Sequence, residues 1–191
     1  MDKVDYSNIH LALVHFPVYN KIGEVVVSSV TTLDVHDVSR VCRTYGAGNF
    51  YVVTPLKTQQ ELVERMVGHW MTGHGAEYNP TRKDALQQTK VIKSLDEVIN
   101  ELTEQSGEKP RVVVTSAKEV PNSIGYKSLR EKLNKDGGPV LLVFGTGWGL
   151  EKNLIKNADY VLEPIKGNSG FNHLPVRGAI AIILDRLLGR S

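Results

Sequence analysis

The sequence is poor in several features that would assign it to a specialised class of protein. It has a single cysteine, Cys42, so no disulfide can form within the chain and a disulfide-stabilised secreted scaffold is excluded. The longest apolar run, residues 178–184, is far shorter than the roughly 20 residues needed to cross a bilayer. The first ten residues lack the basic and apolar segments of a signal peptide. We therefore expect a cytoplasmic protein with no membrane association.

Neither positive nor negative charge is in large excess. Lysine and arginine number 23 and aspartate and glutamate number 21, which gives a net charge of +2. A dedicated DNA-packaging protein would carry a much larger basic excess, so no DNA partner is expected, although a local basic patch could still bind nucleic acid. The hydrophobic fraction of 41% supports a packed core, and 191 residues suit a single domain over residues 1–191.

Short apolar runs alternate with amphipathic segments along the chain. Several of these runs are continuously apolar, which is typical of strands buried on both faces of a parallel sheet. Because helical patterns separate them, we predict an α/β fold with a mostly parallel sheet flanked by helices. The six predicted strands span residues 9–16, 50–55, 90–94, 111–116, 139–145 and 159–164.

Helix starts are marked between the predicted strands. Thr58 with Glu61, and Ser94 with Glu97, have the spacing of a capping box. The last segment, residues 175–188, is apolar nearly all round, with proline at its first turn. A helix of that kind is buried inside its own fold or at a subunit contact.

Two longer segments, residues 69–84 and 163–175, are rich in glycine, asparagine, proline and aromatic residues. We predict that they are loops, and long loops in a compact domain often carry function. His69 and His74 lie in the first segment, five residues apart with a glycine between them. That spacing does not form a helical chelate and the lone cysteine offers no further ligand, so no metal site is predicted.

A glycine-rich loop, residues 145–149, directly follows a buried strand. Glycines let the backbone approach a ligand closely, and ligands of open parallel sheets bind just past the carboxyl ends of strands. An ordinary strand-to-helix turn is the alternative. The loop lacks the Gly-Lys-Ser/Thr ending of a P-loop, which excludes an NTPase of that type. Its glycine spacing and the short remaining chain also disfavour NAD binding.

Two further segments carry candidate polar residues. Asn172 and His173 come just before the last helix, where free backbone amides could hold polar groups of a ligand, or where Asn172 could cap a core helix. A helix after Thr32 carries Asp37, Arg40 and Arg43. Arg40 and Arg43 share a face and could hold a phosphate or polarise a substrate, unless they merely form a solvated surface.

These three segments, in this order, resemble the motifs of the SPOUT RNA methyltransferases. Arg43-Thr44 resembles the Arg-Thr pair of the SpoU-type helix, residues 139–149 the strand and loop of the knot, and residues 170–188 the last loop and helix. Residues 73–82 and 172–188 resemble more closely a small bacterial group that occurs near, or fused to, the tRNA guanine-N1 methyltransferase. The resemblance runs from about residue 9 to the end of the chain.

The resemblance implies a SPOUT fold with a deep trefoil knot over about residues 111–191. It also implies S-adenosylmethionine as cofactor, RNA (most often tRNA) as substrate, and a homodimer whose active sites combine both subunits. The cofactor-binding residues that it implies are Thr115, Ser116, Phe144, Gly145, Thr146, Gly147, Leu162, Pro164, Ile165, Asn172, His173, Leu174 and Val176.

The resemblance also implies catalytic candidates. Arg43 takes the place of the arginine implicated in activating a ribose hydroxyl, and Arg40 lies beside it. Asp37 stands where the SpoU-type relatives have asparagine, and Pro175 and Arg177 replace the asparagine and serine of their last motif. These departures argue against a ribose target and make Asp37 a candidate base for a ring nitrogen.

Phosphate contacts to the substrate RNA are expected from Arg82, Lys83 and Arg177, with Tyr78 or Trp70 as stacking surfaces. A second reading of function stays open. The chain could be a SPOUT-like module that binds RNA without catalysis and assists another RNA-modifying enzyme.

Overall fold

A parallel six-stranded sheet forms the centre of the computed structural model, which describes residues 5–190. Residues 1–4, part of the segment considered above for a signal peptide, lie outside the described residues. The strand order is β5-β4-β1-β7-β6-β8, and every neighbouring pair is parallel. All six predicted strands are confirmed, as is the α/β class. Their bounds are β1 Ile9–Val14, β4 Phe50–Val53, β5 Thr89–Ile92, β6 Arg111–Thr115, β7 Val140–Gly145 and β8 Tyr160–Leu162.

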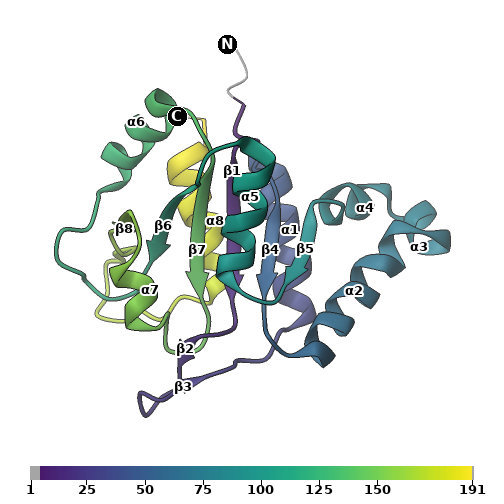
Figure 1. Ribbon diagram of the computed structural model, residues 1–191, viewed down its shortest axis with the longest axis horizontal. Helices are drawn as coiled ribbons and strands as arrows, with labels where there is room; N and C mark the ends of the chain where they lie inside the picture. Colours follow the sequence, from purple (N-terminus) through teal and green to yellow (C-terminus); the bar gives the residue numbers. More distant parts are fainter. Residues whose placement is uncertain (1–4, 191) are drawn as a thin grey trace.

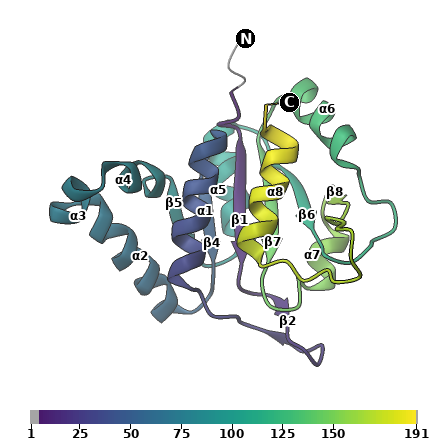
Figure 2. The same cartoon turned by 180° about the vertical axis from the view of Figure 1, so that it is seen from behind.

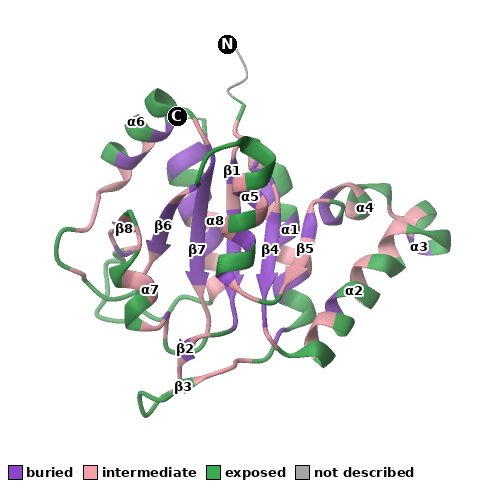
Figure 3. Cartoon of the chain, in the orientation of Figure 1, coloured by how far each residue is buried: buried purple, intermediate pink, exposed green. Residues whose placement is uncertain are grey.

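Helices cover both faces of the sheet (Figures 1 and 2). Helices α1 (Thr32–Tyr45), α8 (Val176–Leu188) and α6 (Tyr126–Asp136) share one hydrophobic cluster with Leu11, Leu13 and other side chains of that face. Helix α5 (Leu95–Ser106) packs on the opposite face, and α7 (Lys152–Lys156) contributes to the same hydrophobic cluster near β8. The central strands are therefore buried on both faces (Figure 3), as their continuous apolar sequences predict.

Beyond the β5 edge, helices α2 (Lys57–Met71), α3 (Gly73–Tyr78) and α4 (Pro80–Leu86) form an extension from the main body (Figure 1). The prediction of a loop over residues 69–84 is therefore wrong. Its glycine, asparagine and proline residues mark breaks between short helices: Gly73 has φ +64°, and the Asn79 side chain accepts a hydrogen bond from the Arg82 backbone at the start of α4. Residues 163–175, the other predicted loop, contain no helix or strand.

The predicted helix starts have mixed outcomes. Ser94 accepts a hydrogen bond from the Glu97 backbone at the start of α5, as predicted. The predicted cap at Thr58 is wrong, because α2 begins at Lys57 and has no side-chain cap. Thr54 instead holds the start of α2. Its hydroxyl accepts a hydrogen bond from the Leu56 backbone, and its carbonyl accepts one from the Gln60 side chain.

Two short strands complete the fold. β2 (Val18–Tyr19) and β3 (Val25–Val26) form an antiparallel ribbon below the carboxyl ends of β1 and β7. β2 also reaches the loop after β7, through a bridge between Val18 and Leu150. In residues 5–190, no helix has the length and apolar character needed to cross a membrane.

Two histidines, His15 buried and His10 half-buried, predict how the fold responds to acid. Burial lowers the pKa of both His10 and His15 to about 4, and the His10 ring also accepts a hydrogen bond from the Asn49 backbone, which requires an unprotonated Nδ1. The unfolded chain therefore binds protons below pH ~6.5 that the folded chain does not bind until pH ~4. We expect the free energy of unfolding to be highest above pH 6.5 and to fall as pH drops, by on the order of 2 kcal/mol for each histidine between pH 7 and pH 5.

Urea unfolding at several pH values measures this effect. His10→Gln should reduce the slope of the free energy of unfolding against pH between 6.5 and 4, and the slope that remains should come from His15. An equal slope in wild type and His10→Gln would contradict the role assigned to His10.

Candidate functional site

A cavity of about 790 Å³ lies at the carboxyl ends of β6 and β7. Its wall is formed by the ends of these strands, the loops that follow them, and the segment before α8. Eleven of the thirteen residues predicted to bind a cofactor line it. They are Thr115, Ser116, Phe144, Gly145, Thr146, Gly147, Ile165, Asn172, His173, Leu174 and Val176.

The other two predicted residues, Leu162 and Pro164, do not line the cavity. Both are buried, and Leu162, at the end of β8, belongs to the hydrophobic cluster beneath α1 and α8. Their contribution to the site is to support the chain at Glu163 and Ile165, which do line the cavity.

The glycines of the loop after β7 are required by close backbone contacts. A Cβ on Gly145 would lie 2.8 Å from the Leu150 nitrogen, and one on Gly147 would lie 2.9 Å from the Tyr19 carbonyl oxygen. Gly147 also has φ +58°, a conformation that favours glycine. The path of the loop therefore depends on contact with a distant part of the chain.

That distant part is β2, which supports the loop through main-chain hydrogen bonds. The Tyr19 backbone donates to the Gly149 carbonyl at 2.9 Å, and the Trp148 backbone donates to the Tyr19 carbonyl at 2.9 Å. Thr146 donates to the Val14 carbonyl at 3.0 Å and shares a 2.5 Å hydrogen bond with the Ser28 hydroxyl. The segment between β1 and α1 thus fixes the floor of the cavity.

The segment over residues 163–175 closes the other side. The Asn172 side chain donates to the Ala117 carbonyl at 2.8 Å, across the cavity mouth, and Lys166 pairs with Glu119 at 2.8 Å. Asn172 does not cap the last helix, because Pro175 occupies the cap position. Helix α8 anchors this segment through Leu184 and Leu187, which are fully buried and each contribute roughly 1.5–3 kcal/mol of hydrophobic stabilisation.

An ion pair joins Asp37 of α1 to Arg177 in the first turn of α8. Arg177, which directly follows the cavity residue Val176, donates through one terminal nitrogen to Asp37 at 2.8 Å, and its Nε lies 3.5 Å from Asp34. Asp34 is itself fixed near the start of α1, where it accepts a hydrogen bond from Thr31 at 2.5 Å. Arg177 and Asp37, two positions at which this sequence departs from the SpoU-type motifs, therefore contact each other.

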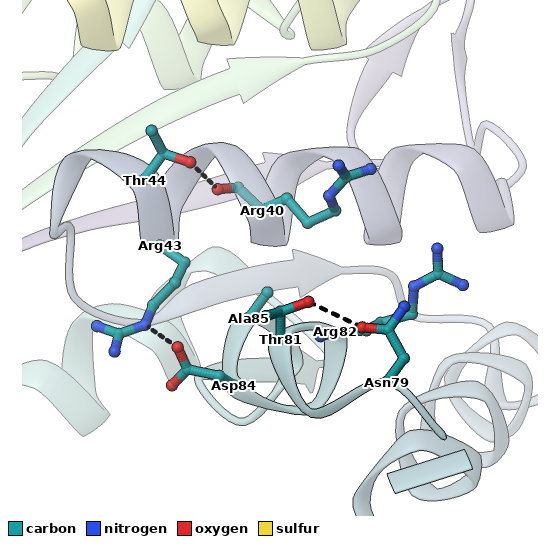
Figure 4. Close-up of a pocket in the computed structure, with 8 residues that line it drawn as sticks. All are labelled: Arg40, Arg43, Thr44, Asn79, Thr81, Arg82, Asp84 and Ala85. Carbon is teal, nitrogen blue, oxygen red and sulfur yellow. Dashed lines mark hydrogen bonds and ion pairs between the residues drawn. The ribbon is translucent and has the colours of Figure 1, made fainter. Parts of the chain in front are cut away.

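Arg40 and Arg43 lie elsewhere. They line a second pocket of about 320 Å³ between α1 and α4 (Figure 4), which shares no lining residue with the large cavity. Arg43 pairs with Asp84 at 2.7 Å. Within one chain, none of the three predicted catalytic residues lines the large cavity, but Asp37 contacts Arg177, which directly follows the cavity residue Val176.

Other residues of the cavity were not predicted. Tyr19, Trp148 and Leu150 line it, together with residues 117–120. Trp148 lies within the glycine-rich loop and Leu150 directly follows it, so their position in the sequence was an available signal. Tyr19 could not be found this way, because it is more than a hundred residues away in the sequence. In the part of the chain that the structure describes, no group of three histidine, cysteine, aspartate or glutamate side chains could hold a metal ion.

Comparisons with known proteins bear on this site. The model of a family described as SAM-dependent RNA methyltransferase matches residues 8–189. An uncharacterised protein of Aquifex aeolicus is 40% identical, over 97% of this chain and 90% of that protein. A protein of Nitratidesulfovibrio vulgaris named tRNA (guanine-N(1)-)-methyltransferase is 43% identical over 95% of this chain, which spans only 42% of that protein's length. Among solved structures, the TrmH/SpoU tRNA modifying enzyme of A. aeolicus has a TM-score of 0.56 at 14% identity, over 96% of this chain and 75% of that one.

Proposed function

Because the chain belongs to the family of SAM-dependent RNA methyltransferases, we propose that it methylates a nucleotide of tRNA, with S-adenosylmethionine held in the large cavity. The observation that carries this proposal is the cavity itself. It lies at the carboxyl ends of two adjacent parallel strands, where such sheets bind ligands, and a glycine loop and a closing segment enclose it. When bound, the cofactor supplies a methyl group with enough electrophilic character to react with a nitrogen or oxygen atom.

The residues of the cavity fit this cofactor. A volume of about 790 Å³ suits a molecule of that size. Ile165, Leu174 and Val176 offer apolar contacts for an adenine ring. Within residues 5–190, the backbone amides of Ile165 and Leu174 donate to no protein group, so they are free to bind the edge of the ring. The other polar groups of the cofactor would meet Thr115, Ser116 and the loop at Gly145–Gly147.

Asp37 is the proposed proton acceptor. Methyl transfer requires a group that holds the nucleophile in line with the methyl group and accepts its proton. The Arg177 guanidinium holds the Asp37 carboxylate at the first turn of α8, where the preceding residue, Val176, lines the cavity. A carboxylate at this position suits removal of a proton from a base ring nitrogen, which is why we favour a base over a ribose hydroxyl as the target.

Arg40 and Arg43 are proposed to act across a homodimer. These arginines line a different pocket of their own chain, which supports their serving the cavity of a second copy. Dimerisation, a trefoil knot over about residues 111–191 and a single domain over residues 1–191 remain predictions, as does the cytoplasmic location that a tRNA substrate would require. The longer relative's name motivates tRNA, but that name describes a protein of which the present chain spans less than half.

Incubation with S-adenosylmethionine labelled in its methyl group tests the proposal. We expect label to enter total tRNA from cells that lack the gene, and mass spectrometry of the digested RNA to identify one methylated nucleoside. Calorimetric titration should show binding of S-adenosylmethionine and none of NAD. Binding of both cofactor and tRNA without any methyl transfer would instead support the alternative function, in which the protein binds RNA without catalysis.

A further inference from the structure

The smaller pocket, between α1 and α4, carries more positive than negative charge. Three guanidinium groups, those of Arg40, Arg43 and Arg82, line it with a single carboxylate, that of Asp84. Asp84 pairs with Arg43, and within the described residues neither Arg40 nor Arg82 has a carboxylate within ion-pair distance. Figure 4 shows the guanidinium groups of Arg40 and Arg82 at the same end of the gap, away from the Arg43–Asp84 pair.

Arg82 is held in place by an aromatic cluster. Its guanidinium carbon lies 4.5 Å from the centre of the Trp70 ring, a cation–π contact. His36 and His69 pack edge-on against the same ring, with centroid distances of 6.0 and 5.1 Å. Burial, followed by the positive charge of Arg82, lowers the pKa of His36, so this histidine adds no charge of its own near pH 7. The stacked face of Arg82 is therefore occupied, while its N–H edge stays available for a ligand.

The remaining polar groups of the pocket present donors. The Asn79 side-chain oxygen accepts from the Arg82 backbone and from the Thr81 hydroxyl, which orients its amide and leaves the NH₂ group without a protein partner in the described chain. Two unpaired guanidinium groups and an amide donor around one space match an anion with several oxygen atoms. The pocket volume of about 320 Å³ leaves room for such a group.

We infer that this pocket binds a phosphate group of the substrate RNA backbone, with Arg82 and Arg40 as its ligands. This inference rests on the proposed function, and it names where the RNA strand is held. A phosphodiester recurs at every nucleotide of RNA, so a fixed pair of arginines positions the strand whatever its sequence.

Salt-dependent binding of bulk tRNA to the full chain tests this inference. We expect Arg82→Gln to weaken binding by roughly 10-fold and to lower the slope of log affinity against log salt by about one. Affinity for S-adenosylmethionine should not change. Arg82→Lys keeps the positive charge but loses the planar guanidinium group, which can donate two parallel hydrogen bonds to a phosphate. It should therefore keep the salt slope and bind tRNA more weakly than wild type.

Lys109 provides the control. It is exposed in the turn before β6, at the amino end of that strand, and lines neither pocket, so Lys109→Gln should change tRNA affinity by less than about 2-fold. If Arg82→Gln keeps the wild-type tRNA affinity, salt slope and methyl transfer, the inference that this pocket binds RNA phosphate is overturned and the proposed function stands. Loss of inorganic phosphate binding in Arg82→Gln without any change in tRNA binding would assign the pocket to free phosphate and would also overturn it. No tRNA binding and no transfer by the wild type would remove both proposals.

Discussion

Replacing Gly147 with valine is expected to lower the affinity for S-adenosylmethionine by at least roughly 100-fold, because the side chain has neither the space nor the backbone conformation that it needs. Its Cβ would lie 2.9 Å from the Tyr19 carbonyl oxygen, at φ +58°. The loop could relieve this contact only by moving off β2 and losing the hydrogen bonds that join Tyr19 to Trp148 and Gly149. The loop forms the floor of the proposed cofactor site, so its displacement changes the shape of the cavity.

Calorimetric titration with S-adenosylmethionine measures the effect, and thermal unfolding shows whether the variant still folds. Gly147→Ala should give an intermediate loss, since alanine tolerates a left-handed backbone better than a β-branched residue does. Gly170→Ala is the matched control in the closing segment, where a Cβ would meet nothing within 4 Å. A folded Gly147→Val protein with wild-type affinity would show that the cofactor does not bind against this loop.

The central strands were predictable from the sequence because they contain runs of apolar residues that a parallel strand covered on both faces can bury. Residues 140–144 are all buried, and the same is true of residues 50–53. Their order in the sheet was not predictable, since β1 lies between β4 and β7, which are far apart in the sequence. The order decides which loops meet at the cavity.

The predicted cofactor residues came from a resemblance, and the family membership behind it is confirmed. Local patterns alone would have left Asn172 as a helix cap, whereas its side chain binds the Ala117 carbonyl. The segment over residues 69–84 shows the opposite error. Its loop-like composition reflects helix breaks at Gly73 and Asn79, and the position of Arg82 against Trp70 depends on how α4 packs on α1 and α2. Such tertiary contacts leave no periodic signal in the sequence.

Replacing Arg43 with alanine is expected to reduce kcat for RNA methylation by roughly 100- to 1,000-fold, because a positioned charge next to the nucleophile would be lost. The affinity for S-adenosylmethionine should not change, since Arg43 lies outside the cavity of its own chain. Single-turnover assays with saturating tRNA separate this effect on kcat from the effect on tRNA binding expected of Arg82→Gln. Asp37→Asn should lower kcat by a similar factor, with partial recovery in Asp37→Glu. Full turnover in Asp37→Asn would exclude this carboxylate as the proton acceptor.

Mixing variants distinguishes the chain on which each residue acts. If Arg43 serves the cavity of a second copy, equal amounts of Arg43→Ala and Gly147→Val protein should exchange into mixed dimers that contain one complete site, which would restore about a quarter of wild-type activity. Asp37 pairs with Arg177 of its own chain beside its own cavity. The mixture of Asp37→Asn with Gly147→Val should therefore stay inactive, because neither chain then joins a working cofactor loop to its own carboxylate. Recovery in the second mixture instead of the first would reverse both assignments, and recovery in neither would argue for sites built within one chain.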